Sequence, residues 1–307
     1  MSSEQIFKKV LVAIDGSSPS VIAEELAVFM AKKLDSRVAV LHVISHGFMG
    51  SRLEKYIPIL EKDVPLGTGG GPEERVPAVP ASGAQEAVAN EITMSYRQAG
   101  TDVIEEAVAL FKEQGIPVDQ KLLEHADPAE SIIREAEKGN YDLVVIGSSG
   151  EEEKKPHLGS VARKTALYAK TSVLIAREKR QISRVIVPVD GSEHSRKVVH
   201  YATILAKKLD LEVALLHVQE PDLPPRIMKE IGTRILSEAA GQFEGIKIDQ
   251  KLASGDPAKT IIQTAKKGDY DLILMGHKGH SMVAQFLLGS VSDHVIQYID
   301  RSVLLIK

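Results

Sequence analysis

The chain has no cysteine, no tryptophan and few aromatic residues of any kind, and these absences narrow its function. Without cysteine it forms no disulfides. Aromatic residues make up 4% of the 307 residues, too few for a row of exposed rings on which nucleic-acid bases stack. Its 38 Lys and Arg against 42 Asp and Glu also lack the basic excess of a nucleic-acid binder. We therefore expect no nucleic-acid partner.

Long apolar runs are absent as well. No run reaches the ~18 residues that a membrane span needs, and the first ten residues, MSSEQIFKKV, do not form an apolar signal segment. We expect a cytoplasmic protein that has no membrane partner. Apolar residues nevertheless make up 43% of the sequence, and the length corresponds to about two domains of ~150 residues. Two buried cores are therefore expected.

An internal repeat is the most informative feature of the sequence. The segment VLVAIDGS at 10–17 returns as VIVPVDGS at 185–192. The segment AKKLDSRVAVLHV at 31–43 returns as AKKLDLEVALLHV at 206–218, with the same offset of 175 residues. Two matches with one offset indicate that the chain contains two copies of one folding unit.

The repeat continues farther along the chain with a shorter offset. YDLVVIG at 141–147 matches YDLILMG at 270–276 with an offset of 129. SVLIA at 172–176 matches SVLLI at 302–306 with an offset of 130. The first copy therefore contains about 45 residues that the second lacks. Between the copies, Arg177 to Ser183 is predicted to be a short charged linker.

These offsets predict two domains, which we call the first copy, 1–179, and the second copy, 180–307. The extra residues of the first copy fall near 45–95. Gly and Pro cluster from Pro65 to Gly83 without a helical or alternating period, so most of the insertion is interpreted as a surface loop. The alternative is a short helix over Arg52 to Leu60 that covers a site or a partner.

Each copy alternates apolar strands with amphipathic helices. The expected strands of the first copy are Val10 to Ile14, Val38 to Val43, Val118 to Leu122, Leu143 to Ile146 and Val173 to Ala176. Nearly continuous apolar runs of this kind are typical of parallel sheets that are covered on both faces. The order βαβαβαβαβ therefore predicts an α/β fold with two copies of a doubly wound, five-stranded parallel sheet.

The helices between these strands have recognisable starts and faces. Asp127-Pro128 and Asp256-Pro257 each read as an N-cap followed by an N1 proline, with the helices ending near Gly139 and Gly268. In the first helix of the second copy a single stripe at helical spacing is expected to be buried. Its members are Val198, Ala202, Leu205 and Leu209.

Two loops in each copy follow the carboxyl ends of strands, where ligands bind in open parallel sheets. One is Asp190-Gly191-Ser192, matched by Asp15-Gly16-Ser17. The other runs from Gly276 to Gly279 and, nine residues later, reaches Gly289-Ser290 at the start of a helix. Glycines allow close approach of the backbone to a ligand, and the start of a helix offers N–H groups to phosphate. The pair of loops could hold phosphates without a P-loop lysine.

With an aspartate ending the first strand and a His-Val pair ending the second, the pattern G-x2-G-x9-G-[ST] resembles the ATP-binding type of universal stress protein. The resemblance covers both copies apart from the insertion. It implies strand order 3-2-1-4-5, an adenine nucleotide alpha hydrolase-like fold, and two domains packed as a pseudo-two-fold pair. Whether this internal pair doubles into a homodimer stays open.

The resemblance also implies a function and a site. It implies an adenine-nucleotide binder, for ATP or AMP with or without Mg²⁺, that senses or regulates in the stress response together with an unidentified protein partner. In the second copy the base and ribose would lie against Pro188, Val189, Asp190 and Val218. The ribose and phosphates would lie against Met275, Gly276, Gly279, Gly289, Ser290, Val291 and Ser292.

The first copy departs from this pattern. Eight residues instead of nine separate Gly150 from Gly159, and they read EEEKKPHL. Each glutamate would repel a polyphosphate by about 1 kcal/mol at ~7 Å and an effective dielectric constant of ~40. A weaker site, suited to AMP or to no nucleotide, is expected there. Its residues are Ala13, Ile14, Asp15, Val43, Ile146, Gly147, Gly150, Gly159 and Ser160.

Several alternatives stay open. A slow ATPase is one, a nucleotide-free dimerisation scaffold is another, and an adenylating enzyme of the PP-loop type is a third, although its S-G-G-x-D-S loop is absent. No Ser-His-Asp arrangement, Walker lysine or paired acids are evident, so no catalytic residue and no committed enzyme are predicted.

Some residues have simpler interpretations. Ser160 and Ser290 could be plain helix N-caps. His277, His280 and His294 lack a companion carboxylate at ligand spacing, so no metal is predicted. His42 and His217 lie within apolar strands and are predicted to be core histidines whose ring nitrogens are hydrogen-bonded.

Overall fold

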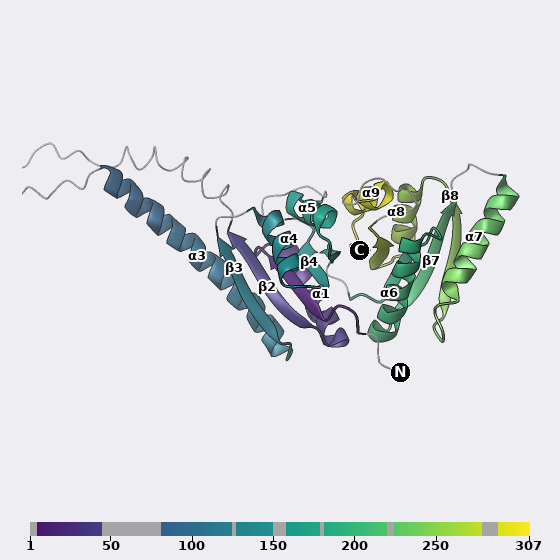
Figure 1. The fold of residues 1–307 in the computed structure, drawn as a ribbon, viewed down its shortest axis with the longest axis horizontal. Coiled ribbons are helices and arrows are strands. Elements are labelled where there is room, and N and C mark those ends of the chain that lie inside the picture. Colours follow the sequence, from purple (N-terminus) through teal and green to yellow (C-terminus); the bar gives the residue numbers. More distant parts are fainter. Residues whose placement is uncertain are drawn as a thin grey trace, which may run out of the picture.

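The computed structural model describes residues 5–44, 81–124, 127–149, 158–178, 181–219, 224–277 and 288–307. Within these ranges both copies show the predicted alternation of strands and helices (Figure 1). The elements of the first copy are β1 (Lys9–Ile14), α1 (Ser18–Leu34), β2 (Arg37–Ile44), α3 (Ala81–Glu113), β3 (Val118–Glu124), α4 (Pro128–Lys138), β4 (Leu143–Gly147), α5 (Ser160–Tyr168) and β5 (Ser172–Ala176). Those of the second copy are β6 (Arg184–Pro188), α6 (Glu193–Leu209), β7 (Glu212–Gln219), α7 (Pro225–Ala240), β8 (Ile248–Ser254), α8 (Pro257–Lys267), β9 (Leu272–Gly276), α9 (Ser290–Tyr298) and β10 (Ser302–Ile306).

The ten strands form one continuous sheet in the order β3-β2-β1-β4-β5-β10-β9-β6-β7-β8. Each copy supplies five parallel strands in the order 3-2-1-4-5, which confirms the predicted fold. The two halves join where β5 and β10 pair antiparallel, with Leu174 opposite Leu304. Leu304 is the counterpart of Leu174 in the repeat, so the joint has the local two-fold symmetry that the resemblance implied.

Helices cover both faces of the sheet because consecutive strand residues point to opposite sides. Val10 and Val12 pack in one apolar cluster with α1, α3, α6 and α7. Leu11 and Ala13 pack in a second cluster with α4, α5, α8 and α9. Each cluster contains residues of both copies, so the apolar core continues across the joint between them.

The local signals at the helix ends are confirmed. Asp127 and Asp256 are the N-caps of α4 and α8, and each carboxylate accepts a hydrogen bond from the backbone N–H three residues on. Gly139 and Gly268 are the C-caps of the same helices. The predicted apolar stripe of α6, which is Val198, Ala202, Leu205 and Leu209, is buried.

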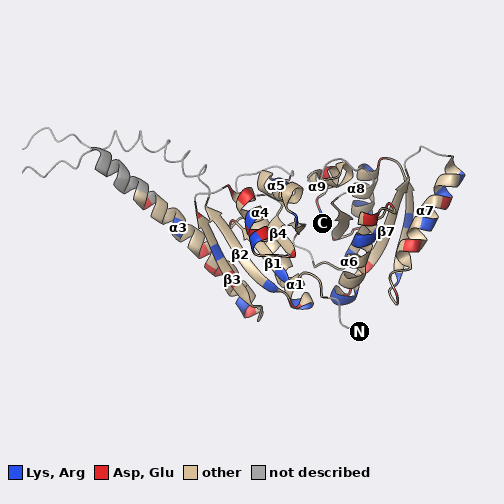
Figure 2. Ribbon diagram, viewed as in Figure 1, with Lys and Arg blue, Asp and Glu red and all other residues tan. Residues whose placement is uncertain are grey.

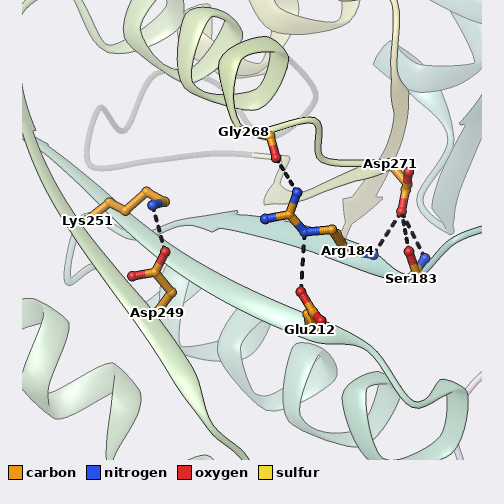
Figure 3. A network of polar contacts seen from close by, with 7 residues as sticks. All are labelled: Ser183, Arg184, Glu212, Asp249, Lys251, Gly268 and Asp271. Carbon is orange, nitrogen blue, oxygen red and sulfur yellow. Dashed lines mark hydrogen bonds and ion pairs between the residues drawn. The ribbon is translucent and has the colours of Figure 1, made fainter.

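A polar network lies at the amino-terminal ends of the strands in the second copy (Figure 3). The carboxylate of Asp271 accepts hydrogen bonds from Ser183 N, Ser183 Oγ and Arg184 N at 2.8–2.9 Å. The Arg184 side chain pairs with Glu212 and donates to Gly268 O. In the first copy Asp142 accepts from Lys9 N at 2.9 Å in the same way. These carboxylates pair the first N–H groups of β1 and β6, which the sheet itself leaves without a partner.

The insertion differs from the prediction at its end. Helix α3 begins at Ala81, inside the segment predicted to be a loop, and continues for 33 residues (Figure 1). Its carboxyl-terminal half packs on the sheet through Ile104, Val108 and Phe111. A helix that is stabilised at one end extends through strong helix formers such as those in AQEAVANE. The packing of the carboxyl-terminal half of α3 therefore also stabilises its first turns. The predicted short helix over Arg52 to Leu60 lies outside the described residues.

Charges of both signs are intermixed on the described helices, α3 and α7 included, and do not form a field of one sign (Figure 2). This distribution agrees with the balanced composition of the chain. None of the helices in the described part of the chain is long and apolar enough to cross a membrane.

Candidate functional site

A cavity of about 670 Å³ opens at the carboxyl ends of the first copy's strands. It lies where β1 neighbours both β2 and β4, so the chain leaves these strands toward opposite faces of the sheet. In open parallel sheets this reversal point is where ligands bind. The volume falls within the range of small-molecule pockets. The first copy thus has a candidate site at the position that the sequence indicated.

The loop after β1 forms one wall of the cavity and is held by its own side chains. Asp15 Oδ1 accepts hydrogen bonds from Ser17 N at 3.0 Å and Ser17 Oγ at 2.6 Å. The backbone N–H of Asp15 donates to Ser20 Oγ at 3.2 Å. Gly16 has a φ of +78°, which favours glycine. The loop is therefore preorganised in this conformation.

The second copy repeats this loop. Ser192 N donates to Asp190 Oδ1 at 2.9 Å, and Asp190 N donates to Ser195 Oγ at 3.3 Å. Gly191 has a φ of +79°. Because the hydrogen bonds and the backbone angle match those of the first copy, Asp-Gly-Ser builds the same turn twice.

The opposite wall is the start of α5, matched by α9 in the second copy. The N-caps are Gly159 and Gly289, and neither helix has a side-chain hydrogen bond at its cap. The expectation that Ser160 and Ser290 are plain N-caps is therefore wrong, since each is the first helical residue and its side chain is exposed. A helix start without a side-chain cap presents its N–H groups and its partial positive charge to the cavity.

Eight of the nine site residues predicted in the first copy line this cavity, and Gly150 lies outside the described residues. The eight are Ala13, Ile14, Asp15, Val43, Ile146, Gly147, Gly159 and Ser160. They come from β1, β2, β4 and the start of α5, which are far apart in the sequence. The topology of the sheet brings them together.

The residues predicted in the second copy occupy the corresponding places. Pro188 ends β6, Val218 lies near the end of β7, and Met275 and Gly276 end β9. Val189 and Asp190 follow β6, while Ser290, Val291 and Ser292 form the first turn of α9 after Gly289. Ser292 is buried and its hydroxyl donates to Gly276 O at 2.8 Å, which connects α9 to the end of β9. Gly279 lies outside the described residues.

Helix α3 supplies a wall that the sequence did not predict. Tyr96, Ala99, Gly100 and Val103 line the cavity from this helix. A Cβ on Gly100 would lie 3.0 Å from His42 Cδ2, and in α7 a Cβ on Gly232 would lie 2.8 Å from His217 Cδ2. These two glycines are therefore counterparts at an offset of 132, and a glycine inside each helical pattern was the available signal. The remaining lining residues, also not predicted, are Gly16, Ser20, Leu41, His42, Ile44, Pro128, Ile132, Ser149, Val161 and Ala162.

The two strand histidines are less buried than predicted. His42 Nδ1 lies 2.9 Å from Ile14 O, and His217 Nδ1 lies 2.8 Å from Val189 O. The hydrogen bonds of core histidines are thus present, but both side chains are only partly buried. His42 also lines the cavity. Each ring holds the loop after its own first strand in place.

A buried carboxyl group lies beside the first cavity. Glu24 of α1 is 7% exposed and accepts a hydrogen bond from Ser20 Oγ at 3.0 Å. Burial raises its pKa to about 7, and the nearby charges of Glu106 and Asp15 act in the same direction. Its counterpart in the second copy is Val199. The second copy therefore lacks this ionisable group, which no motif revealed.

The histidines considered as metal ligands lie in other settings. His277 is buried, with Nε2 3.4 Å from Leu167 O of the first copy. His294 lies against the ring of Tyr298, with centroids 4.6 Å apart. His280 lies outside the described residues. Among the residues that the structure describes, no group of three or more His, Cys, Asp or Glu side chains could hold a metal ion.

Comparisons with known proteins agree over most of the chain. Universal stress protein Slr1230 of Synechocystis is 23% identical over 301 residues, covering 94% of this chain and 96% of that protein. Stress response protein NhaX of Bacillus subtilis is 31% identical over 170 residues, covering 55% of this chain and 97% of that protein.

A solved structure has the same arrangement over its full length. The crystal structure of a universal stress protein from Archaeoglobus fulgidus has a TM-score of 0.68 and 23% identity, covering 98% of both chains. The sequence model of the universal stress protein family matches residues 6–63, 76–177 and 181–307. Because these matches include both copies, the chain belongs to the universal stress protein family as a tandem protein.

Proposed function

We propose that this protein binds an adenine nucleotide, ATP or AMP, and acts in the stress response as a sensor or regulator rather than as a committed enzyme. The observation that carries the proposal is the cavity at the reversal point of the first copy's sheet, with its preorganised loop and its helix start without a side-chain cap. The second copy repeats both elements.

The chemistry of the lining fits a nucleotide. Ile14, Val43 and Ile146 offer apolar surface against which a base can pack. Neither Lys nor Arg is among the described lining residues. In our proposal the phosphates therefore lie at the amino-terminal end of α5, where the helix dipole favours an anion.

We propose that the second copy is the stronger site. It has the full glycine pattern from Gly276 to Ser290, while the first copy has three glutamates in the shorter loop after Gly150. The contrast between Glu24 and Val199 supports this ranking. A carboxyl group with a pKa of about 7 is partly ionised at neutral pH and would repel a bound phosphate.

A sensor is favoured over a hydrolase by the bonding of the titratable groups in the described lining. The Asp15 carboxylate is engaged by Ser17, and one ring nitrogen of His42 is engaged by Ile14 O. In our proposal these hydrogen bonds give both groups the role of holding the loop after β1 in place. A slow ATPase and a PP-loop-type adenylating enzyme can be distinguished from a sensor by the products that they form from ATP.

Thermal unfolding with and without ATP, ADP or AMP tests the proposal. A ligand at about 100 times its dissociation constant adds about 2.7 kcal/mol to the free energy of unfolding. No stabilisation by any of the three would favour a nucleotide-free scaffold. Release of AMP and pyrophosphate from ATP would indicate an adenylating enzyme, and release of ADP and phosphate an ATPase.

Matched variants test the ranking of the two sites. Gly279→Glu should remove most of the binding, whereas Gly150→Glu should have little effect. Gly241→Glu, at the end of α7, adds the same charge at a position whose new Cβ would meet only ordinary contacts at 3.5 Å. It should leave binding unchanged. Equal losses from Gly279→Glu and Gly150→Glu would contradict the ranking.

A further inference from the structure

The joint between the two copies is symmetric in its backbone. Leu174 of β5 faces Leu304 of β10, and these residues are counterparts at an offset of 130. Any residue near the local two-fold axis of such a pair meets its own counterpart. The side chains near the axis therefore show whether each copy could pair with an identical copy or only with the other copy.

Several contacts at the joint are the same in both directions. Arg177 N donates to Ser302 Oγ at 3.2 Å, and Lys307 N donates to Ser172 Oγ at 3.4 Å. The Arg177 guanidinium donates to a backbone carbonyl of α9, and Lys307 Nζ donates to one of α5 at 2.8 Å. Arg177, which was predicted to begin a short charged linker, is partly buried at the joint, and burial lowers its pKa to about 10. These contacts would also be available between two identical copies.

The contact between α5 and α9, unlike those above, joins residues of opposite charge. Arg163 Nη2 lies 3.1 Å and 3.2 Å from the two carboxylate oxygens of Asp293. Each residue is the fourth of its helix, and they are counterparts at the same offset of 130. Figure 1 shows the two helices beside each other above the centre of the molecule. One position of the repeat thus carries a cation in the first copy and an anion in the second.

A second ion pair across the joint also runs in one direction only. The guanidinium of Arg301, just before β10, pairs with the Glu178 carboxylate that follows β5. The Arg301 side chain is only 14% exposed and also lies near Asp269 and Asp300 of its own copy. The counterpart of Arg301 is Thr171, which has no charge. In a pair of two first copies, Glu178 would therefore meet an uncharged threonine where it now meets Arg301.

We propose that these charges make the joint specific for the opposite copy. Two first copies would place Arg163 against Arg163 and leave Glu178 beside Thr171. Two second copies would place Asp293 against Asp293, and Arg301 would lose Glu178. Since a like-charge contact replaces an attractive one in both cases, neither copy forms the symmetric pair that its backbone would allow. This inference is independent of nucleotide binding.

Cutting the folded chain tests the inference directly. A protease recognition sequence inserted between Lys179 and Arg180, at the proposed domain boundary, allows the full-length protein to be folded first and cut afterwards. The two halves are then unfolded together in urea, refolded by dilution, and weighed by native mass spectrometry. We expect pairs of one first and one second copy, with identical pairs below a tenth of the total. A statistical mixture, in which identical pairs make up half, would overturn the proposal.

Charge reversal in the uncut chain provides a second and independent test. Arg163→Asp and Asp293→Arg each create a like-charge contact, and each should lower the equilibrium constant for folding about threefold to tenfold in low salt. The double variant restores an opposite pair with the direction reversed, and it should recover most of the loss. Arg134→Asp, at an exposed position of α4, is the matched control for the reversal of one charge. Failure of the double variant to recover would overturn the role of this pair.

Discussion

The Ser20 hydroxyl donates a hydrogen bond to the buried carboxyl group of Glu24, 3.0 Å away, beside the cavity of the first copy. Burial raises the pKa of Glu24 to about 7 from the 4.5 of an exposed glutamate. Since the pKa is higher in the folded state, the stability contributed by Glu24 is complete below pH 4.5 and is lost as the pH rises through 7.

Glu24→Gln removes this titration. Relative to the variant, the wild type should lose up to about 3 kcal/mol of stability between pH 4.5 and about pH 8, the value that the full pKa difference would give. Urea unfolding at several pH values measures the difference. Glu230→Gln, which removes an exposed carboxyl group from α7 of the second copy, is the control for the loss of one charge. A parallel pH dependence of Glu24→Gln and the wild type would show that Glu24 titrates normally.

The end of β4 lies against the start of α1. A Cβ on Gly147 would lie 2.7 Å from both C and O of Pro19. Because backbone atoms cannot move aside easily, Gly147→Ala should destabilise the protein by about 1–3 kcal/mol. Gly241→Ala, where the new Cβ would have ordinary contacts at 3.5 Å, should be neutral or slightly stabilising. Calorimetry of both variants makes the comparison, and equal effects would contradict the close approach.

The core that continues through the joint predicts one unfolding transition for the whole chain. Leu174 and Leu304 are fully buried in the same apolar cluster. Leu304→Ala should cost about 2–5 kcal/mol. It should shift the whole transition, not only the part from the second copy, because the two halves share a sheet and a core. Two separate transitions in calorimetry would contradict this coupling.

The wall that α3 forms predicts a difference between the two sites. Ala99 lines the first cavity, and its counterpart at the offset of 132 is Ile231 of α7. Ala99→Ile would place a larger side chain at the cavity, so it should weaken any AMP binding to the first copy about tenfold and leave the second copy unaffected. Calorimetric titration in a Gly279→Glu background isolates the first site. Unchanged affinity there would mean that the ligand does not reach α3.

Much of the fold could be predicted from the sequence because its signals are local. The apolar runs of the strands, the Asp-Pro starts of α4 and α8 and the glycine turn after β1 each depend on neighbouring residues alone. The offset of 130 also aligned β5 with β10. The start of α3 at Ala81 could not be predicted in this way, because the packing of Ile104 and Phe111 stabilises a helix whose first turns have little pattern of their own.

By itself, the sequence determined that there are two copies of one α/β unit, which residues form their strands, and which loops end them. Only the tertiary structure decided that Tyr96 and Ala99 border the first cavity, that Glu24 is buried beside it, and that Arg163 meets Asp293. The physical reason is that strand and turn signals act between neighbours in the chain. The walls of the cavity, the buried carboxyl group and the ion pair between the copies instead depend on segments that are distant in the chain and meet only in the folded protein.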